Sequence, residues 1–106
     1  MNLFKTVPTV SVAEAAAAVT AKDATFIDVR TPEEYAEGHA AGAVNVPLEK
    51  IGSAVEHLKQ FSKVYVICRT GTRSAVAVSK LLSARVNAFN VSGGTMEWLQ
   101  HGLPMD

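Results

Sequence analysis

The segment VYVICRTGTRSAVAVSKLL, residues 64–82, places the two strongest structural signals of this chain side by side. Residues 64–67 are continuously apolar and β-prone, which predicts a buried central strand. A short loop follows, and from Ala75 to Leu82 apolar residues recur with the spacing of one helix face. A buried strand followed directly by an amphipathic helix is the repeating unit of parallel α/β folds. This segment therefore predicts the fold class.

The alternation of strands and helices continues on both sides of this segment. Further strands are expected at residues 24–29, 43–46 and 86–91, and helices at about 12–21, 32–38, 51–58 and around 97–99. Ser11 with Glu14, and Thr31 with Glu34, have the spacing of a capping box at a helix start. The alternation predicts an α/β fold: a three-layer sandwich with a central, mostly parallel sheet of about five strands flanked by helices. Ligands of such sheets bind beyond the C-terminal ends of the strands.

Length and composition restrict the function classes. The 106 residues suffice for one domain, and we expect residues 1–106 to form it. Ten basic residues balance ten acidic ones, so bulk charge predicts neither a nucleic-acid nor a membrane partner. The alanine-rich stretch 13–18 contains Glu14 and is preceded by a single cationic side chain, Lys5, so we expect a helix there and not a targeting segment. No apolar run approaches the length of a membrane span, so we expect a cytoplasmic protein. No His/Cys cluster has metal-ligand spacing, and we expect no cofactor.

The loop between the central strand and its helix carries the candidate chemistry. The only cysteine, Cys68, ends the strand; Arg69, Thr70, Gly71, Thr72 and Arg73 follow, and Ser74 is expected to open the helix. Such a loop can turn backbone N–H groups inward as an anion cradle, and a helix N-terminus adds partial positive charge. Together with two arginines, these features favour a thiolate over a thiol. A cysteine buried only for packing is the alternative, but it needs no arginines beside it.

The loop resembles the active-site loop of rhodaneses, in which a cysteine leads a six-residue turn before a helix. Other motifs agree in order: Phe26-Ile27-Asp28-Val29-Arg30, Thr31-Pro32-Glu33-Glu34-Tyr35, Gly38-His39, Gly42-Ala43, Asn45-Val46-Pro47, and Gly93-Gly94 followed by Trp98. The resemblance covers nearly the whole chain. One departure is Ala40-Ala41, where the family usually has larger apolar and proline residues, so the packing of this segment differs from the family pattern.

The resemblance implies a two-step sulfur transfer through a persulfide on Cys68. The thiolate would attack the outer sulfur of an anionic donor such as thiosulfate, and cyanide or a thiol, including a protein thiol, would then remove the sulfur. The residues Arg69, Thr70, Gly71, Thr72 and Arg73 would bind the donor, the two arginines through its oxygens. An arginine directly after the cysteine suits thiosulfate better than mercaptopyruvate in this family.

Two other functions fit parts of the same pattern. Phosphatases and arsenate reductases use a thiolate in a similar loop, but related phosphatases have arginine six positions after the cysteine, whereas Arg73 is five after Cys68. Rhodanese-like domains also serve as binding or sulfur-carrier modules without steady turnover. Measured turnover with small donors separates the carrier from the enzyme.

The remaining polar residues are expected to be structural. Asp28 and Arg30 are predicted to form ion pairs with residues such as Glu34 or Glu37, although orienting the loop is the alternative role. His39 is not needed as a base, because sulfur transfer to a thiolate involves no proton abstraction. His57 and His101 are expected to be solvated. Gly93 and Gly94 predict a turn near the active face, and Trp98 predicts a core anchor.

Overall fold

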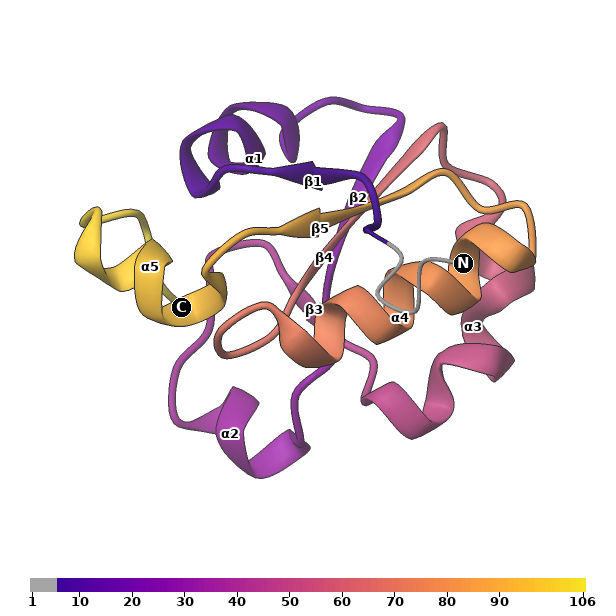
Figure 1. The fold of residues 1–106 in the computed structure, drawn as a ribbon. Coiled ribbons are helices and arrows are strands. Elements are labelled where there is room, and N and C mark those ends of the chain that lie inside the picture. The colour runs from indigo at the N-terminus through magenta and orange to yellow at the C-terminus, as the bar shows by residue number, and fades with distance from the viewer. Residues whose placement is uncertain (1–5) are drawn as a thin grey trace.

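A five-stranded parallel sheet forms the centre of the molecule, in the order β1-β5-β4-β2-β3. The computed structural model describes residues 6–106, so the part of the expected domain before Thr6, including Lys5, lies outside the described residues. The strands are β1 (Thr9–Val10), β2 (Ala24–Asp28), β3 (Val44–Asn45), β4 (Lys63–Ile67) and β5 (Ala88–Val91). The order places β4 in the middle of the sheet, as its apolar run predicts (Figure 1).

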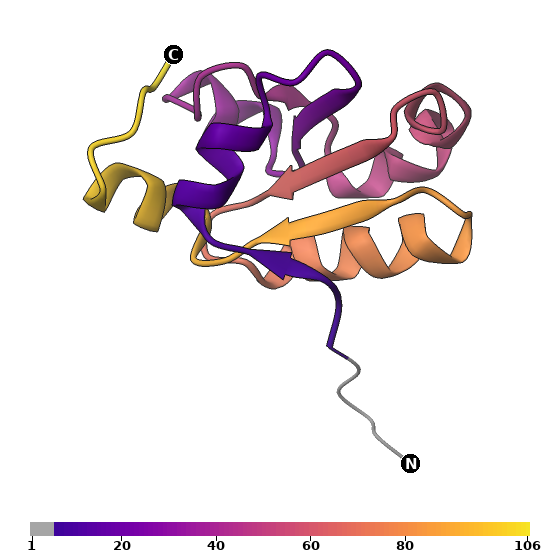
Figure 2. The ribbon, with the colours of Figure 1, turned by 90° about the horizontal axis from the view of Figure 1, so that it is seen from above.

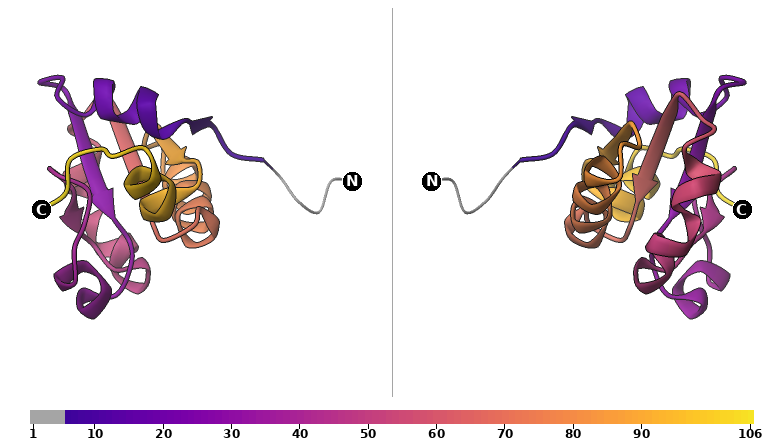
Figure 3. Two further views of the ribbon diagram at one scale, coloured as in Figure 1. Left: turned by 90° about the vertical axis from the view of Figure 1, so that its left-hand side faces the viewer. Right: turned by 90° about the vertical axis from the view of Figure 1, so that its right-hand side faces the viewer.

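Helices cover both faces of the sheet (Figures 2 and 3). They are α1 (Val12–Ala18), α2 (Pro32–Ala36), α3 (Ile51–Leu58), α4 (Thr72–Ser83) and α5 (Gly94–Gln100), with a 3₁₀ turn η1 at Leu48–Lys50. Val64 and Val66 of β4 pack in one cluster with α3 and α4, whereas Tyr65 and Ile67 pack in a second cluster with α1 and α5. Successive side chains of a strand point to opposite faces, so an uninterrupted apolar run is needed for a strand buried on both sides. The predicted three-layer α/β sandwich is confirmed.

The predicted capping boxes are both present. The Ser11 hydroxyl accepts from the Glu14 amide at 3.0 Å, and the Glu14 carboxylate accepts from the Ser11 amide at 3.0 Å. Thr31 and Glu34 form the same reciprocal pair at the start of α2, with Pro32 at the first helical position. These local signals need no tertiary contact, which is why they can be identified in the sequence.

Several element boundaries differ from the prediction. The strand β1 was not expected, because two residues are too few for a periodic signal; it pairs with β5 at the sheet edge. The first helix ends at Ala18 instead of residue 21, and the expected strand 43–46 is reduced to Val44–Asn45. The helix α4 begins at Thr72 instead of Ser74, because Gly71 in a left-handed conformation already provides its N-cap.

The face of α4 that packs on the sheet is shifted by one position from the predicted one. Leu82, which was expected on the buried face, is exposed, whereas Ala77, which was not expected there, is fully buried. The buried residues of this helix are Ser74, Ala77, Val78 and Leu81. Ser74 thus continues the buried stripe into the first turn, where it lies beside the C-terminal end of β4.

The parallel arrangement brings the C-terminal ends of the strands to one edge of the sheet, where the loop after β4 lies. The chain end also comes near this edge, because residues 103–106 return to the segment after α2. The amide of His39 donates to the carbonyl of Asp106, and the amide of Ala41 donates to the carbonyl of Pro104. Residues 6–106 contain no helix whose length and hydropathy would let it span a lipid bilayer.

Candidate active site

Cys68 directly follows β4, and its side chain is held by the first turn of α4. The amide of Gly71 donates to Cys68 Sγ at 3.1 Å, and Ser74 Oγ lies 3.2 Å from the same sulfur. Gly71 has φ +111°, a left-handed conformation that turns its amide back toward the sulfur. Cys68 is 1% exposed, so its sulfur lies at the bottom of the loop.

These hydrogen bonds favour the ionised sulfur. Burial by itself raises the pKa of the Cys68 thiol, because a charged sulfur loses hydration there. Hydrogen bonds from the Ser74 hydroxyl and from the amides of Ser74, Gly71 and Thr70 outweigh this cost, and the pKa is below its ordinary value. The expected amide cradle at the helix start is therefore part of the cause of the lowered pKa, whereas neither loop arginine is hydrogen-bonded to the sulfur in residues 6–106.

The N-terminus of α5 is hydrogen-bonded to the carbonyl groups on the outer side of the loop. The amide and the hydroxyl of Thr95 both donate to the carbonyl of Cys68, at 2.8 and 3.0 Å, and the amide of Met96 donates to the carbonyl of Arg69 at 3.1 Å. A Cβ on Gly94 would lie 2.5 Å from these two carbonyl oxygens, so only glycine permits the approach. Because the carbonyls are tied to α5, the loop is held with its amide groups free to face the sulfur.

The Arg73 side chain is paired with an acidic residue. It forms a bidentate ion pair with Glu34 of α2, with nitrogen to oxygen distances of 2.7 and 2.9 Å. The hydrogen bond from Arg73 lowers the pKa of Glu34 to about 2. The pair connects α2 to the first turn of α4. It also makes Arg73 less available to a bound anion than the sequence alone implies.

Arg30 also has a different partner from the expected one. Its guanidinium binds the buried Asp28 carboxylate at 2.8 Å and donates to the carbonyl of Gly38 at 2.8 Å, so the prediction of a pair with Glu34 or Glu37 is wrong. The reason is geometric: Asp28 and Arg30 lie on the same side of one extended segment, two residues apart. Both residues are in an ion pair, as predicted, but with each other as partners.

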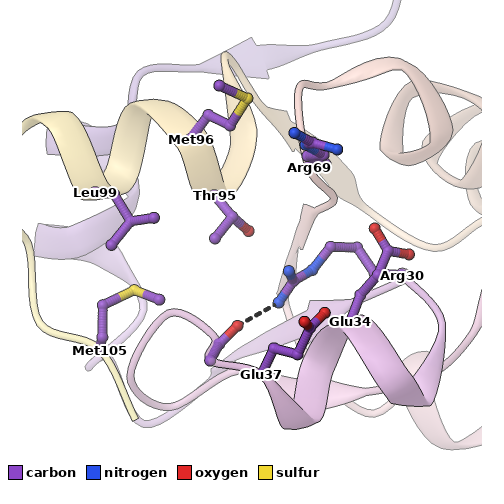
Figure 4. A pocket seen from close by; sticks show the side chains of 9 residues that line it. Arg30, Glu34, Glu37, Arg69, Thr95, Met96, Leu99 and Met105 are labelled. Atoms are coloured by element: carbon purple, nitrogen blue, oxygen red, sulfur yellow. Dashed lines mark hydrogen bonds between the residues drawn. The ribbon is translucent and has the colours of Figure 1, made fainter.

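A pocket of about 480 Å³ lies next to the loop (Figure 4). Thr95, Met96 and Leu99 of α5 line one side, with Met105 below them, and Arg30 and Arg69 lie opposite. The other lining residues are Glu34, Glu37 and Gly38. Arg69 makes no salt bridge within residues 6–106, so it is a cation available to a ligand at this position.

The predicted loop residues divide into distinct groups. Gly71 contacts the sulfur, the Thr70 amide contributes to lowering the pKa of Cys68, and Arg69 lines the pocket. Thr72 begins α4 and is exposed, and the Arg73 side chain binds Glu34.

His39 stacks on Tyr35 at 3.6 Å between ring centroids, and Trp98 is buried with its indole N–H donating to the carbonyl of Pro104. These last two positions fit the structural roles expected for them.

Sequence reasoning missed the side chains that reach the site from other elements. Asn90 of β5 accepts a hydrogen bond from Ser74, and Thr95 binds the carbonyl of Cys68. A buried polar residue inside an apolar strand was the available signal for Asn90. No group of three or more His, Cys, Asp or Glu residues that could hold a metal ion occurs in residues 6–106.

Comparisons with known proteins agree with this geometry. A family model described as "Rhodanese-like domain" matches residues 11–101. A protein of Arabidopsis thaliana named "Thiosulfate sulfurtransferase 16, chloroplastic" is 37% identical, with 74% of this chain and 77% of the relative covered. The solved structure of a rhodanese-related protein from Thermoplasma volcanium has a TM-score of 0.84 and 31% identity, covering 94% of this chain and 98% of that one. A putative sulfur carrier protein of Bacillus subtilis is 31% identical, with 69% of this chain but 40% of that protein covered.

Proposed function

This chain belongs to the rhodanese-like domain family, and from that membership we propose that it is a sulfurtransferase that carries sulfane sulfur as a persulfide on Cys68. One observation carries the proposal: the only cysteine lies at the end of the central strand, within hydrogen-bond distance of an amide and a hydroxyl that favour its thiolate. A thiolate is the nucleophile required for attack on a sulfur–sulfur bond.

In the proposed first step, the Cys68 thiolate attacks the outer sulfur of an anionic donor such as thiosulfate. A bond forms between Sγ and the outer sulfur, and the sulfur–sulfur bond of thiosulfate breaks. Sulfite leaves with the bonding electron pair. The hydrogen bonds of Gly71 and Ser74 that act on the thiolate are positioned to stabilise the charge of the persulfide as well.

In the second step, cyanide or a thiolate attacks the terminal sulfur of the persulfide. The bond to Sγ breaks, and Cys68 is released as a thiolate, so no proton transfer and no cofactor is required. Arg69 would bind the anionic end of the donor from the pocket. The backbone of Thr70, Gly71 and Thr72 would form the cradle, and Arg73 would support it by joining the first turn of α4 to Glu34 of α2.

A carrier that is loaded by a partner protein is the second candidate, favoured by the similarity to the putative sulfur carrier protein. It shares the persulfide on Cys68 and differs in lacking steady turnover with small donors. A lone thiol that must stay reduced suits a reducing compartment, and we propose a cytoplasmic location on that basis. A protein thiol is the acceptor class that suits the carrier.

Mass spectrometry after incubation with thiosulfate tests the proposal. The chain is expected to gain the mass of one sulfur atom, which cyanide then removes, while Cys68→Ser gains none and keeps its fold by circular dichroism. Sulfur transfer to cyanide that persists in Cys68→Ser would exclude the mechanism. Loading without repeated turnover would support the carrier. Hydrolysis of an aryl phosphate by the unmodified chain in place of sulfur transfer would support the phosphatase alternative.

A further inference from the structure

Four residues form a closed ring of hydrogen bonds that includes the sulfur of Cys68. Cys68 Sγ contacts the Gly71 amide at 3.1 Å and Ser74 Oγ at 3.2 Å. Asn90 Nδ2 donates to the Gly71 carbonyl at 3.2 Å, and Asn90 Oδ1 accepts from the Ser74 hydroxyl at 2.6 Å. Asn90 is thus bonded to both groups that touch the sulfur. Within residues 6–106, its side chain makes no hydrogen bond to the sulfur itself.

The orientation of the Asn90 amide is determined by its two partners. The Gly71 carbonyl can only accept, so it requires the NH₂ group of Asn90. The oxygen of the same amide must then face Ser74, and at 2.6 Å it must receive the single hydroxyl proton of Ser74. With this proton directed at Asn90, Ser74 presents a lone pair to Cys68. The contact at 3.2 Å is then satisfied by a thiol S–H that donates to Ser74.

In this arrangement the Ser74 hydroxyl cannot bond to a thiolate, because two lone pairs would face each other, and only the backbone amides stabilise the ionised sulfur. For the Ser74 hydroxyl to stabilise the ionised sulfur, its proton must turn from Asn90 to Cys68 Sγ. The Asn90 oxygen then loses its donor, in a position where the side chain is 8% exposed and water has little access. Ionisation of the sulfur therefore competes with the hydrogen bond between Ser74 and Asn90.

We propose that Asn90 is a positioning residue that holds the Ser74 hydroxyl proton away from Cys68 while the sulfur is a thiol, and yields it when the anionic thiolate or persulfide forms. The inference rests on the proposed role of Cys68 as the sulfur-carrying nucleophile. A residue of β5, which is not part of the loop, would thereby influence the ionisation of the buried sulfur.

Charged groups surround this ring but are not part of it. They are Arg69 in the loop, Arg73 on α4 with its partner Glu34 on α2, the Asp28–Arg30 pair at the end of β2, and Glu97 on α5. None of them bonds to Ser74 or to Asn90 in the described part of the chain. Neutral substitutions at positions 74 and 90 therefore leave these charges in place.

The test is the pH dependence of alkylation of Cys68 by iodoacetamide, which reports the thiolate fraction. Asn90→Leu removes the oxygen and the NH₂ group of the side-chain amide and keeps a side chain of similar size. The Ser74 hydroxyl is then free to donate to the sulfur. The midpoint of the alkylation curve is expected to fall by about one pH unit, the equivalent of roughly one hydrogen bond. In the Ser74→Ala background, the same substitution is expected to leave the midpoint unchanged. Asn87→Leu, an exposed position just before β5, is the matched control and is expected to leave the midpoint unchanged.

A folded Asn90→Leu variant with an unchanged or higher midpoint overturns the proposal, and so does an equal fall in both backgrounds. If circular dichroism shows that this variant is unfolded, Asn90→Asp replaces it. A carboxylate accepts the Ser74 proton more strongly than an amide oxygen does, so the midpoint of the alkylation curve should rise. The rise should be larger in the chain that has Ser74 than in the Ser74→Ala background. A fall, or an equal rise in both backgrounds, contradicts the inference.

Loading with thiosulfate separates this inference from the proposed function. If the alkylation shifts occur as expected but the unmodified chain gains no sulfur by mass spectrometry, the sulfurtransferase proposal fails and the role of Asn90 in setting the state of the thiol remains. If sulfur is gained and the shifts are absent, only the role of Asn90 is wrong.

Discussion

Cys68 and Arg69 are adjacent in the chain but have very different surroundings. The cysteine is 1% exposed and is bonded to the first turn of α4, while Arg69 is exposed and lines the pocket. Arg73, the other loop arginine, is held by Glu34. At the scale of single residues, the partner of each side chain thus decides whether it can meet a substrate. The two arginines are therefore expected to differ in function.

Replacement of Arg69 should weaken donor binding more than replacement of Arg73. Loss of a charge-assisted contact costs about 1.5–3 kcal/mol, so Arg69→Ala is expected to raise the KM for thiosulfate roughly tenfold or more, with a smaller effect on kcat. Arg73→Ala is expected to change KM less, because its charge is already paired. Steady-state kinetics with a fixed cyanide concentration measures both, with Lys80→Ala on α4 as the control. Equal, small effects of the two variants would contradict this division and would assign donor binding to the backbone amides and the helix N-terminus.

At the scale of secondary-structure elements, the loop depends on the close approach of α5. Gly94→Ala would place a Cβ 2.5 Å from the carbonyl oxygens of Cys68 and Arg69. The helix would have to move away and break the hydrogen bonds from Thr95 and Met96. We expect a loss of about 2–4 kcal/mol in the free energy of unfolding and a strong loss of sulfur transfer.

Gly102→Ala is the matched control for this substitution. Gly102 also has a positive φ, +65° against +57° for Gly94, but a Cβ there meets nothing within 4 Å. The difference between the two variants in urea unfolding therefore isolates the contact from the backbone strain, which costs about 1–2 kcal/mol alone. Equal losses of stability and activity in the two variants would show that the approach of α5 to the loop is unimportant.

The second contact between elements, from α2 to α4, predicts a pH-dependent stability. The pKa of Glu34 is about 2 in the folded chain, below its ordinary 4.5, because Arg73 binds the carboxylate. The stabilisation is fully present above about pH 4.5 and is lost as the pH falls through about 2. Since the Arg73 side chain is 36% exposed, solvent screening reduces the contribution to about 1 kcal/mol.

Glu34→Gln keeps a capping side chain and removes the charge. It is expected to be less stable than the unmodified chain by about 1 kcal/mol at pH 7, and the difference should vanish toward pH 2. Urea unfolding across this range measures it. Glu33→Gln, an exposed acid in the same turn, should have almost no effect. A stability difference that persists at pH 2 would mean that the ion pair is not its source.

At the scale of the whole molecule, the end of the chain closes the structure over the segment after α2. Ala40 is fully buried and pairs with Met105 in an isolated antiparallel bridge. The indole N–H of Trp98 donates to the Pro104 carbonyl at 2.7 Å, which ties the same segment to α5. Ala40, one of the two alanines that depart from the family pattern, is therefore accommodated, because little space remains at the point where the two segments meet.

A larger side chain at position 40 is expected to separate these segments. Ala40→Leu should lower the free energy of unfolding by about 1–3 kcal/mol through overpacking. Because Met105 also lines the pocket, the KM for thiosulfate should change as well. Ala36→Leu, at an exposed position of α2, is the control and should be nearly neutral. A fully stable Ala40→Leu variant would show that the bridge with Met105 is loosely packed.

Features that depend on neighbours along the chain can be read from the amino-acid order alone. The apolar run of β4, the helix face from Ile51 to Leu58 and the capping boxes at Ser11 and Thr31 are all local patterns, and each is present. The position of Cys68 between strand and helix also follows from local order, because a βα unit places this loop at the C-terminal edge of the sheet.

The side chains that meet at this edge of the sheet depend on long-range packing instead. Glu34 and Arg73 are 39 positions apart, Ser74 and Asn90 are 16 apart, and Thr95 reaches Cys68 across 27 positions. Periodicity and capping rules describe residues within one or two turns and contain no information about such partners. Hydrogen bonding and ion pairing are short-range, so a side chain's role is determined by whichever group the packing of β5, α2 and α5 brings within about 3 Å.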